Sequence, residues 1–133
     1  MEKQIRLKTL HQKRANYAWK CIEEVKKVGS KKYKDEYRSY VERAAALIHR
    51  NGLGYTLAFY RSRFSKSRAY EALYDHIDGW FRQVFRKDKD ILDWIRDDNT
   101  TSIDVLRATR EILAMLDWLK RFAEAELQEE SSS

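Results

Sequence analysis

The chain has 133 residues, a formal net charge of +6, four glycines and no proline. Its length suits one globular domain, and 43% hydrophobic with 36% charged residues predicts an apolar core beneath a densely ionic surface. The turn signals that a sandwich or barrel of many short strands requires are missing, which argues against an all-β fold. We therefore expect an all-α, single-domain helical bundle of about six helices over residues 1–128, with a frayed C-terminal tail at 129–133.

The first half of the chain predicts three helices. Apolar positions recur at three-and-four spacing from Leu7 to Val28, and the pattern stops at Gly29. A second helix starts near Lys32 and ends at the Asn-Gly pair 51–52, where positive φ is tolerated. Residues 53–64 are short and apolar enough for a buried helix or a buried strand, and the lack of a partner strand favours the helix.

Two helices follow in the middle of the chain, and each has two candidate caps. Ser65 or Ser67 can cap a fourth helix that continues to about Arg86. Asp88 or Asp90 can cap a short helix at residues 91–95, before the polar stretch 97–100.

The last helix has the clearest pattern. It begins at Thr101, which forms a sequence resembling a capping box with Asp104, and it runs to Leu127. Its two neighbouring apolar stripes predict a broad buried face that packs against more than one helix. We expect this helix to be central to the core.

The charge is distributed unevenly along the chain. Residues 1–68 contain 18 basic and 6 acidic residues, whereas residues 69–133 contain 9 basic and 15 acidic ones. This asymmetry suits a protein that offers a basic surface to a polyanion and an acidic surface to a basic neighbour, including another copy of itself. The alternative is a helical protein whose asymmetry cancels in three dimensions.

The sequence lacks signals for membranes and secretion. The longest apolar run, residues 112–116, is far shorter than a membrane-spanning helix, and the N-terminal segment has charges throughout. A single cysteine excludes an intrachain disulfide. These features predict a cytoplasmic protein.

Few residues could support catalysis or bind a metal. Cys21 lies on the apolar stripe of the first helix, which favours core packing. His76 with Glu71, Asp75 and Asp78 is the one cluster that resembles a metal site, but residues one and two apart on a helix do not face each other. We expect no catalytic residue, no metal and no cofactor.

Basic residues offer a stronger signal. The segment 61–68 alternates cations with small hydroxyl side chains, which suits phosphate binding but also a solvated turn. Cations in the first and last helices lie off the apolar stripes and could form one strip: Lys13, Arg14, Arg107, Arg110, Lys120 and Arg121. The alternative is intrahelical pairing, of Arg107 with Glu111 and of Arg121 with Asp117.

Three blocks of the sequence resemble, in order, the small helical subunit of the type III-B CRISPR RNA-targeting effector, the Cmr complex. They are Lys13-Arg14 with Tyr17-Ala18, HRNGLGYTLAF at 49–59, and RATRE at 107–111 together with DWLKRFAEA at 117–125. The resemblance implies an all-α protein without known catalytic activity. It also implies copies that stack into a filament beside the backbone subunits and help to hold the guide RNA paired with its target RNA.

The resemblance also implies candidate RNA-binding residues. The positions that match in the family blocks are Lys13, Arg14, Arg110, Lys120 and Arg121. Weaker candidates are Arg50, beside the Asn-Gly turn, and Arg61, which rests on local composition. The implied partners are guide RNA, target RNA, other Cmr subunits and further copies of the chain.

Two other hypotheses remain at this stage. One is a helical protein-interaction module that binds an acidic partner without RNA. A DNA-binding regulator has less support, because no helix-turn-helix with a polar recognition helix stands out.

Overall fold

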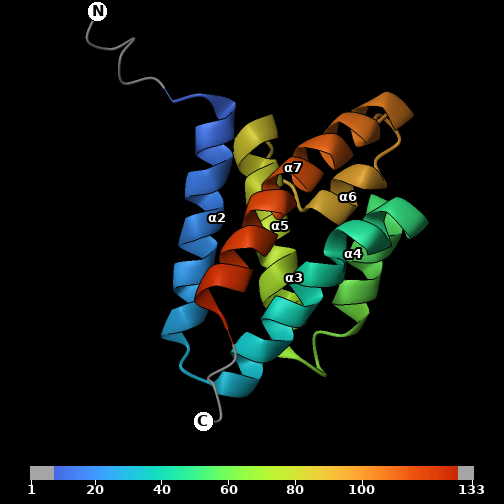
Figure 1. Cartoon of the computed structure of the whole chain (residues 1–133). Coiled ribbons are helices and arrows are strands. Elements are labelled where there is room, and N and C mark those ends of the chain that lie inside the picture. Colours follow the sequence, from blue (N-terminus) through green and yellow to red (C-terminus); the bar gives the residue numbers. More distant parts are fainter. Residues whose placement is uncertain (1–7, 129–133) are drawn as a thin grey trace, which may run out of the picture.

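The computed structural model describes residues 8–128, and within this range every regular element is a helix (Figure 1). The prediction of an all-α bundle of about six helices is confirmed. The expected frayed tail at 129–133 lies outside the described residues. The helices are α2 (Leu10–Lys27), α3 (Lys31–Asn51), α4 (Leu53–Ser62), α5 (Arg68–Phe85), α6 (Ile91–Ile95) and α7 (Ser102–Glu126).

Local side-chain bonds fix the starts of α2 and α7. At α7 the expected box forms: Thr101 Oγ1 accepts from the Asp104 N–H at 3.1 Å, and Asp104 Oδ2 accepts from the Thr101 N–H at 3.0 Å. At α2, Thr9 and Gln12 make the same reciprocal pair, at 3.1 and 2.9 Å. Because a capping box satisfies two otherwise unpaired N–H groups, both starts are well defined.

Two of the expected caps on the middle helices behave differently. Asp90 caps α6 as predicted, since its Oδ1 accepts from the Leu92 N–H at 2.9 Å. Ser67 occupies the position before α5, but its hydroxyl makes no capping bond and instead donates to Glu36 at 3.3 Å. The predicted start of α5 after Ser67 is therefore right. The Ser67 side chain, however, contacts α3 and does not cap α5.

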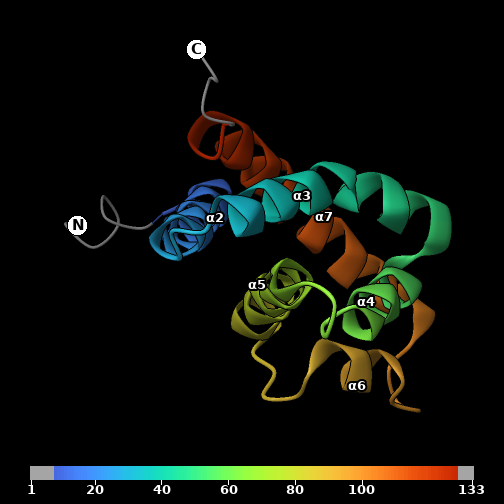
Figure 2. The same ribbon diagram turned by 90° about the horizontal axis from the view of Figure 1, so that it is seen from below.

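Helix α7 lies at the centre of the bundle, against α2, α3 and α5 (Figures 1 and 2). The prediction that the last helix packs against more than one neighbour is confirmed. Helices α2 and α7 run side by side in the same direction, whereas α4 and α6 lie on the opposite side of the molecule from α2 in both views. We call the contact region between α2 and α7 the α2–α7 flank; it lies on the side of the molecule away from α4 and α6.

The core is rich in aromatic side chains. Tyr37, Trp80 and Phe81 are fully buried among aliphatic residues from every helix of the described chain. Cys21 is buried with them, and burial raises the pKa of its thiol to about 12. A thiol that stays protonated packs as a small apolar group, which confirms the core position expected for it.

The two oppositely charged parts of the chain are joined within the fold. Ion pairs connect Arg14 to Glu111 at 2.7 Å, Lys26 to Glu126 at 3.0 Å and Arg61 to Asp90 at 3.6 Å. Each pair takes its cation from residues before 69 and its carboxylate from residues after it. These ion pairs therefore cancel part of the charge asymmetry in three dimensions. The cations that make no ion pair are the ones available to an anionic partner.

Gly79 lies where α5 meets the hydroxyl of Tyr17. An added Cβ would stand 2.6 Å from Tyr17 Oη, which donates to the His76 carbonyl at 2.6 Å. Since the rigid ring is held by that bond, we expect Gly79→Ala to lower the free energy of unfolding by about 1 kcal/mol, measured by chemical denaturation. Gly54→Ala, whose Cβ would meet Ile95 at 3.4 Å, is the control. A Gly79→Ala variant as stable as the wild type would contradict the proposed clash.

Candidate nucleic-acid interface

The seven predicted RNA-binding residues fall into two groups in the structure. Lys13 and Arg14 lie on α2, and Arg110, Lys120 and Arg121 lie on α7, the helix packed beside it. Arg50 and Arg61 lie at the end of α3 and on α4. Because α2 and α4 lie on opposite sides of the molecule, the α4 candidate Arg61 lies apart from the α2 candidates.

Arg14 is held by a buried carboxylate. Its Nε and Nη2 donate to Oε2 and Oε1 of Glu111 at 2.7 and 2.8 Å, and Glu111 Oε2 also accepts from Trp80 Nε1 at 3.1 Å. The hydrogen bond to Glu111 raises the pKa of Arg14 above its ordinary value. Arg14 thus joins α2 to α7, and Glu111 also connects this pair to Trp80 on α5. One edge of the Arg14 guanidinium, formed by Nε and Nη2, is occupied by these hydrogen bonds.

The cations of α7, in contrast to Arg14, make no ion pair with a carboxylate of the described residues. Glu111 bonds Arg14 and Trp80, and the intrahelical pair with Arg107, which was the alternative to a cationic strip, does not form. The alternative pair between Asp117 and Arg121 does not form either. Within residues 8–128 no ion pair is made by any of the α7 cations Arg107, Arg110, Lys120 and Arg121.

The spacing of these cations spreads the charge along the helix. Arg107 and Arg110 line a surface hollow of about 320 Å³ with Arg14 and Glu111. Arg121 lies three turns beyond Arg110 on the same exposed face, roughly 16 Å along the axis. This distance exceeds the reach of one phosphate group, so the two arginines can contact different phosphates of a nucleic-acid strand.

Lys13 is exposed and lines a second hollow, of about 460 Å³, between α2 and α5. Lys8 and Lys20 line the same hollow, and sequence reasoning did not select either of them. The signal was present for Lys20, since residues 13 and 20 are seven apart and share a helix face. With Arg107, these lysines extend the basic surface beyond the predicted set.

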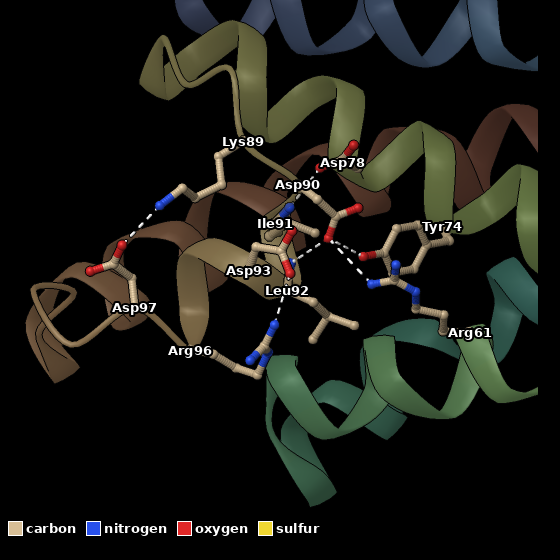
Figure 3. A network of polar contacts seen from close by, with 10 residues as sticks. All are labelled: Arg61, Tyr74, Asp78, Lys89, Asp90, Ile91, Leu92, Asp93, Arg96 and Asp97. Atoms are coloured by element: carbon tan, nitrogen blue, oxygen red, sulfur yellow. Dashed lines mark hydrogen bonds and ion pairs between the residues drawn. The ribbon is translucent and has the colours of Figure 1, made fainter.

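Arg61 belongs to a network that attaches α6 to the bundle (Figure 3). Its Nη1 lies 3.6 Å from Asp90 Oδ1, and its guanidinium lies 5.7 Å from the Tyr74 ring centroid. Asp90 Oδ1 also accepts from the Tyr74 hydroxyl at 2.6 Å, while Asp78 accepts from the Ile91 N–H at 2.8 Å. These contacts indicate that Arg61 helps to hold α6 in place. Arg50, in contrast, is exposed and makes no ion pair among the described residues.

We expect Arg61→Ala to weaken the fold slightly and to leave RNA association unchanged. Because Arg61 is half exposed, its pair with Asp90 should contribute less than about 1 kcal/mol to the free energy of unfolding. Denaturation and RNA retention in the same preparation check both parts. If Arg61→Ala clearly reduced RNA retention without reducing stability, Arg61 would be an RNA-binding residue.

Other residues of the segment 61–68 also make internal contacts. The guanidinium of Arg63 lies over the Phe59 ring at 5.3 Å, and that of Arg68 lies over the Tyr33 ring at 5.7 Å. The Ser62 hydroxyl donates to the Phe59 carbonyl at 2.6 Å. These contacts favour a structured turn over a phosphate-binding loop.

The structure adds little support for other kinds of site. No helix among residues 8–128 has the length and hydropathy needed to cross a membrane. In the same range, no three His, Cys, Asp or Glu side chains are grouped so that they could hold a metal ion. In the cluster considered above, His76 Nδ1 instead bonds the Tyr37 hydroxyl at 2.6 Å, and Asp78 pairs with Arg82 at 2.9 Å.

Comparisons with known proteins give one consistent result. Residues 10–126 match the family model described as CRISPR-associated protein (Cas_Cmr5). The chain is also similar to the CRISPR system Cmr subunit Cmr5 of Thermus thermophilus, with 31% identity over 115 residues. That alignment covers 85% of this chain and 94% of the relative. The match therefore extends over nearly all of the described helices.

Proposed function

The chain belongs to the Cmr5 family of CRISPR-associated proteins, and we propose that it is a non-catalytic structural subunit of a type III-B (Cmr) ribonucleoprotein effector in antiviral defence. In this role it works in the cytoplasm and contacts guide RNA and target RNA through cations of α2 and α7. The observation that carries the proposal is that five cations make no ion pair within residues 8–128: Lys13, Arg107, Arg110, Lys120 and Arg121.

The chemistry of this surface suits a sequence-independent contact. Lysine and arginine side chains neutralise phosphates and release counterions, whatever the base sequence. A subunit that supports many different guides needs such a contact, because base pairing between guide and target supplies the specificity. Arg14 contributes by holding α2 against α7 through its two hydrogen bonds to Glu111.

The proposal includes stacking of copies beside the other subunits. Ile103 and Leu106 are 61% and 49% exposed at the start of α7, unusual values for large apolar side chains. Such residues next to a basic surface suit a contact with a neighbouring protein chain. Acidic residues of the second half that make no ion pair within residues 8–128, such as Asp117 and Glu124, supply a complement for the basic flank of another copy.

Ultraviolet crosslinking of the purified complex tests this function. We expect RNA-crosslinked peptides to come from α2 and α7, and residues 8–27 and 102–126 should account for most of them. Crosslinks confined to α4 and α6 would contradict the proposed surface. A salt-sensitive assembly that forms without any RNA would favour the protein-interaction module that binds an acidic partner.

A further inference from the structure

The hollow between α2 and α5 has a buried polar group at its floor. Its rim carries the lysines Lys8, Lys13 and Lys20, none of which makes an ion pair among residues 8–128. The floor includes His76, whose side chain is 7% exposed and whose Nε2 has no hydrogen-bond partner. An unpaired polar atom at this depth is costly unless a ligand satisfies it.

The hydrogen-bond partner of His76 Nδ1 determines whether Nε2 carries the ring proton. The Tyr37 hydroxyl is fully buried and lies 2.6 Å from His76 Nδ1. Burial raises the pKa of Tyr37 well above its ordinary value and lowers the pKa of His76, so tyrosine stays protonated and histidine stays neutral. The hydroxyl then donates to Nδ1, and the ring proton resides on Nε2. His76 therefore holds an N–H donor buried just beneath the hollow, and this donor becomes accessible when the Glu24 carboxylate moves aside.

Donors and positive charge converge on this space. Three exposed lysines line the hollow, together with the amide residues Asn16 and Gln83. Among the residues that line the hollow, the acidic one is Glu24, whose carboxylate lies 3.6 Å from His76 Nε2, too far for a good hydrogen bond. The Glu24 side chain is 75% exposed, so it can rotate into solvent at little cost.

We propose that the hollow between α2 and α5 is a binding site for one phosphate group, held by His76 Nε2–H and the ammonium groups of Lys8, Lys13 and Lys20. The phosphate is either a phosphodiester of RNA, which rests on the proposed function, or free inorganic phosphate. Both ligands present the same negatively charged oxygens. The site differs from the α7 surface because its deepest donor is a neutral imidazole.

Nuclear magnetic resonance of the histidine rings in the full-length chain tests the site. The His76 Nε2 signal is followed during titration with inorganic phosphate and, separately, with a 12-nucleotide oligoribonucleotide. His11→Gln and His49→Gln variants assign the other two rings. We expect a saturable shift of the His76 signal with both probes, and Lys13→Ala/Lys20→Ala should weaken phosphate binding roughly tenfold. Lys32→Ala/Lys66→Ala serves as the matched control and should leave binding unchanged.

Glu24→Gln gives a sharper test, because the expected change is a gain. Removing the one negative charge beside Nε2 should tighten phosphate binding about threefold to tenfold. If Glu24 serves only to satisfy His76, the substitution leaves phosphate affinity unchanged. That result would overturn the site even when the variant folds normally.

The two probes separate this inference from the proposed function. The Trp118 indole N–H reports on the α2–α7 flank, since its ring lies 4.9 Å from that of His11. An oligoribonucleotide that shifts Trp118 but not His76 leaves the proposed function in place and overturns an RNA phosphate at this site. A His76 shift with inorganic phosphate alone identifies free phosphate as the ligand. No His76 shift with either probe overturns the site.

Discussion

Replacing Glu111 with alanine is expected to lower the free energy of unfolding by about 3 to 5 kcal/mol. The Glu111 carboxylate is buried and receives three hydrogen bonds, two from Arg14 and one from Trp80. Its removal leaves a partly buried guanidinium and a buried indole N–H without partners, and the loss of one member of a buried pair carries a cost of this order. Urea denaturation measures the change.

Two controls separate this effect from a general loss of helix stability. Arg110→Ala changes the neighbouring exposed residue and should alter the free energy of unfolding by no more than about 0.5 kcal/mol. Arg14→Met/Glu111→Leu removes both charges and should recover part of the loss, because no isolated charge remains buried. A Glu111→Ala variant that unfolds at the wild-type denaturant concentration would contradict the role given to this cluster.

The second large effect concerns RNA. In the assembled complex, Arg110→Glu/Lys120→Glu/Arg121→Glu is expected to reduce RNA retention roughly tenfold to hundredfold near physiological salt, because three cations become repulsive to phosphates. All three side chains are exposed and make no ion pair in residues 8–128, so the fold should be stable to within about 0.5 kcal/mol. Filter binding at several salt concentrations and a denaturation curve test both parts.

A matched variant controls for the change in net charge. Lys32→Glu/Arg43→Glu/Lys66→Glu reverses the same number of exposed cations outside α2 and α7. It should leave RNA retention near the wild-type value. Equal losses in the two variants would mean that net charge, and not the α7 surface, governs RNA association.

The sequence was a good guide to the helices, because their signals are local. Capping at Thr101 and Asp90 depends on residues two or three positions away, and both caps form as predicted. Ser67 shows the limit, since its hydroxyl bonds Glu36, 31 residues earlier in the chain. A contact of that kind depends on how helices pack and leaves no periodic signal.

The candidate site was harder to predict for the same reason. Glu111 is four residues from Arg107, which suggested a pair within the helix, but its actual partner is Arg14, 97 residues away. Arg61 was selected from composition, and nothing nearby in sequence indicates its contact with Asp90. The exposed positions Lys13, Arg110, Lys120 and Arg121 were identified correctly as surface cations, because helical periodicity alone places them off the core.

Purification of the tagged chain from its native host tests the central claim most directly. The RNA that accompanies it is sequenced, and the accompanying proteins are identified. We expect short RNAs that share one repeat-derived 5′ segment, together with the other subunits of a Cmr complex. Recovery of the chain alone, or with an acidic partner and no RNA, would contradict it.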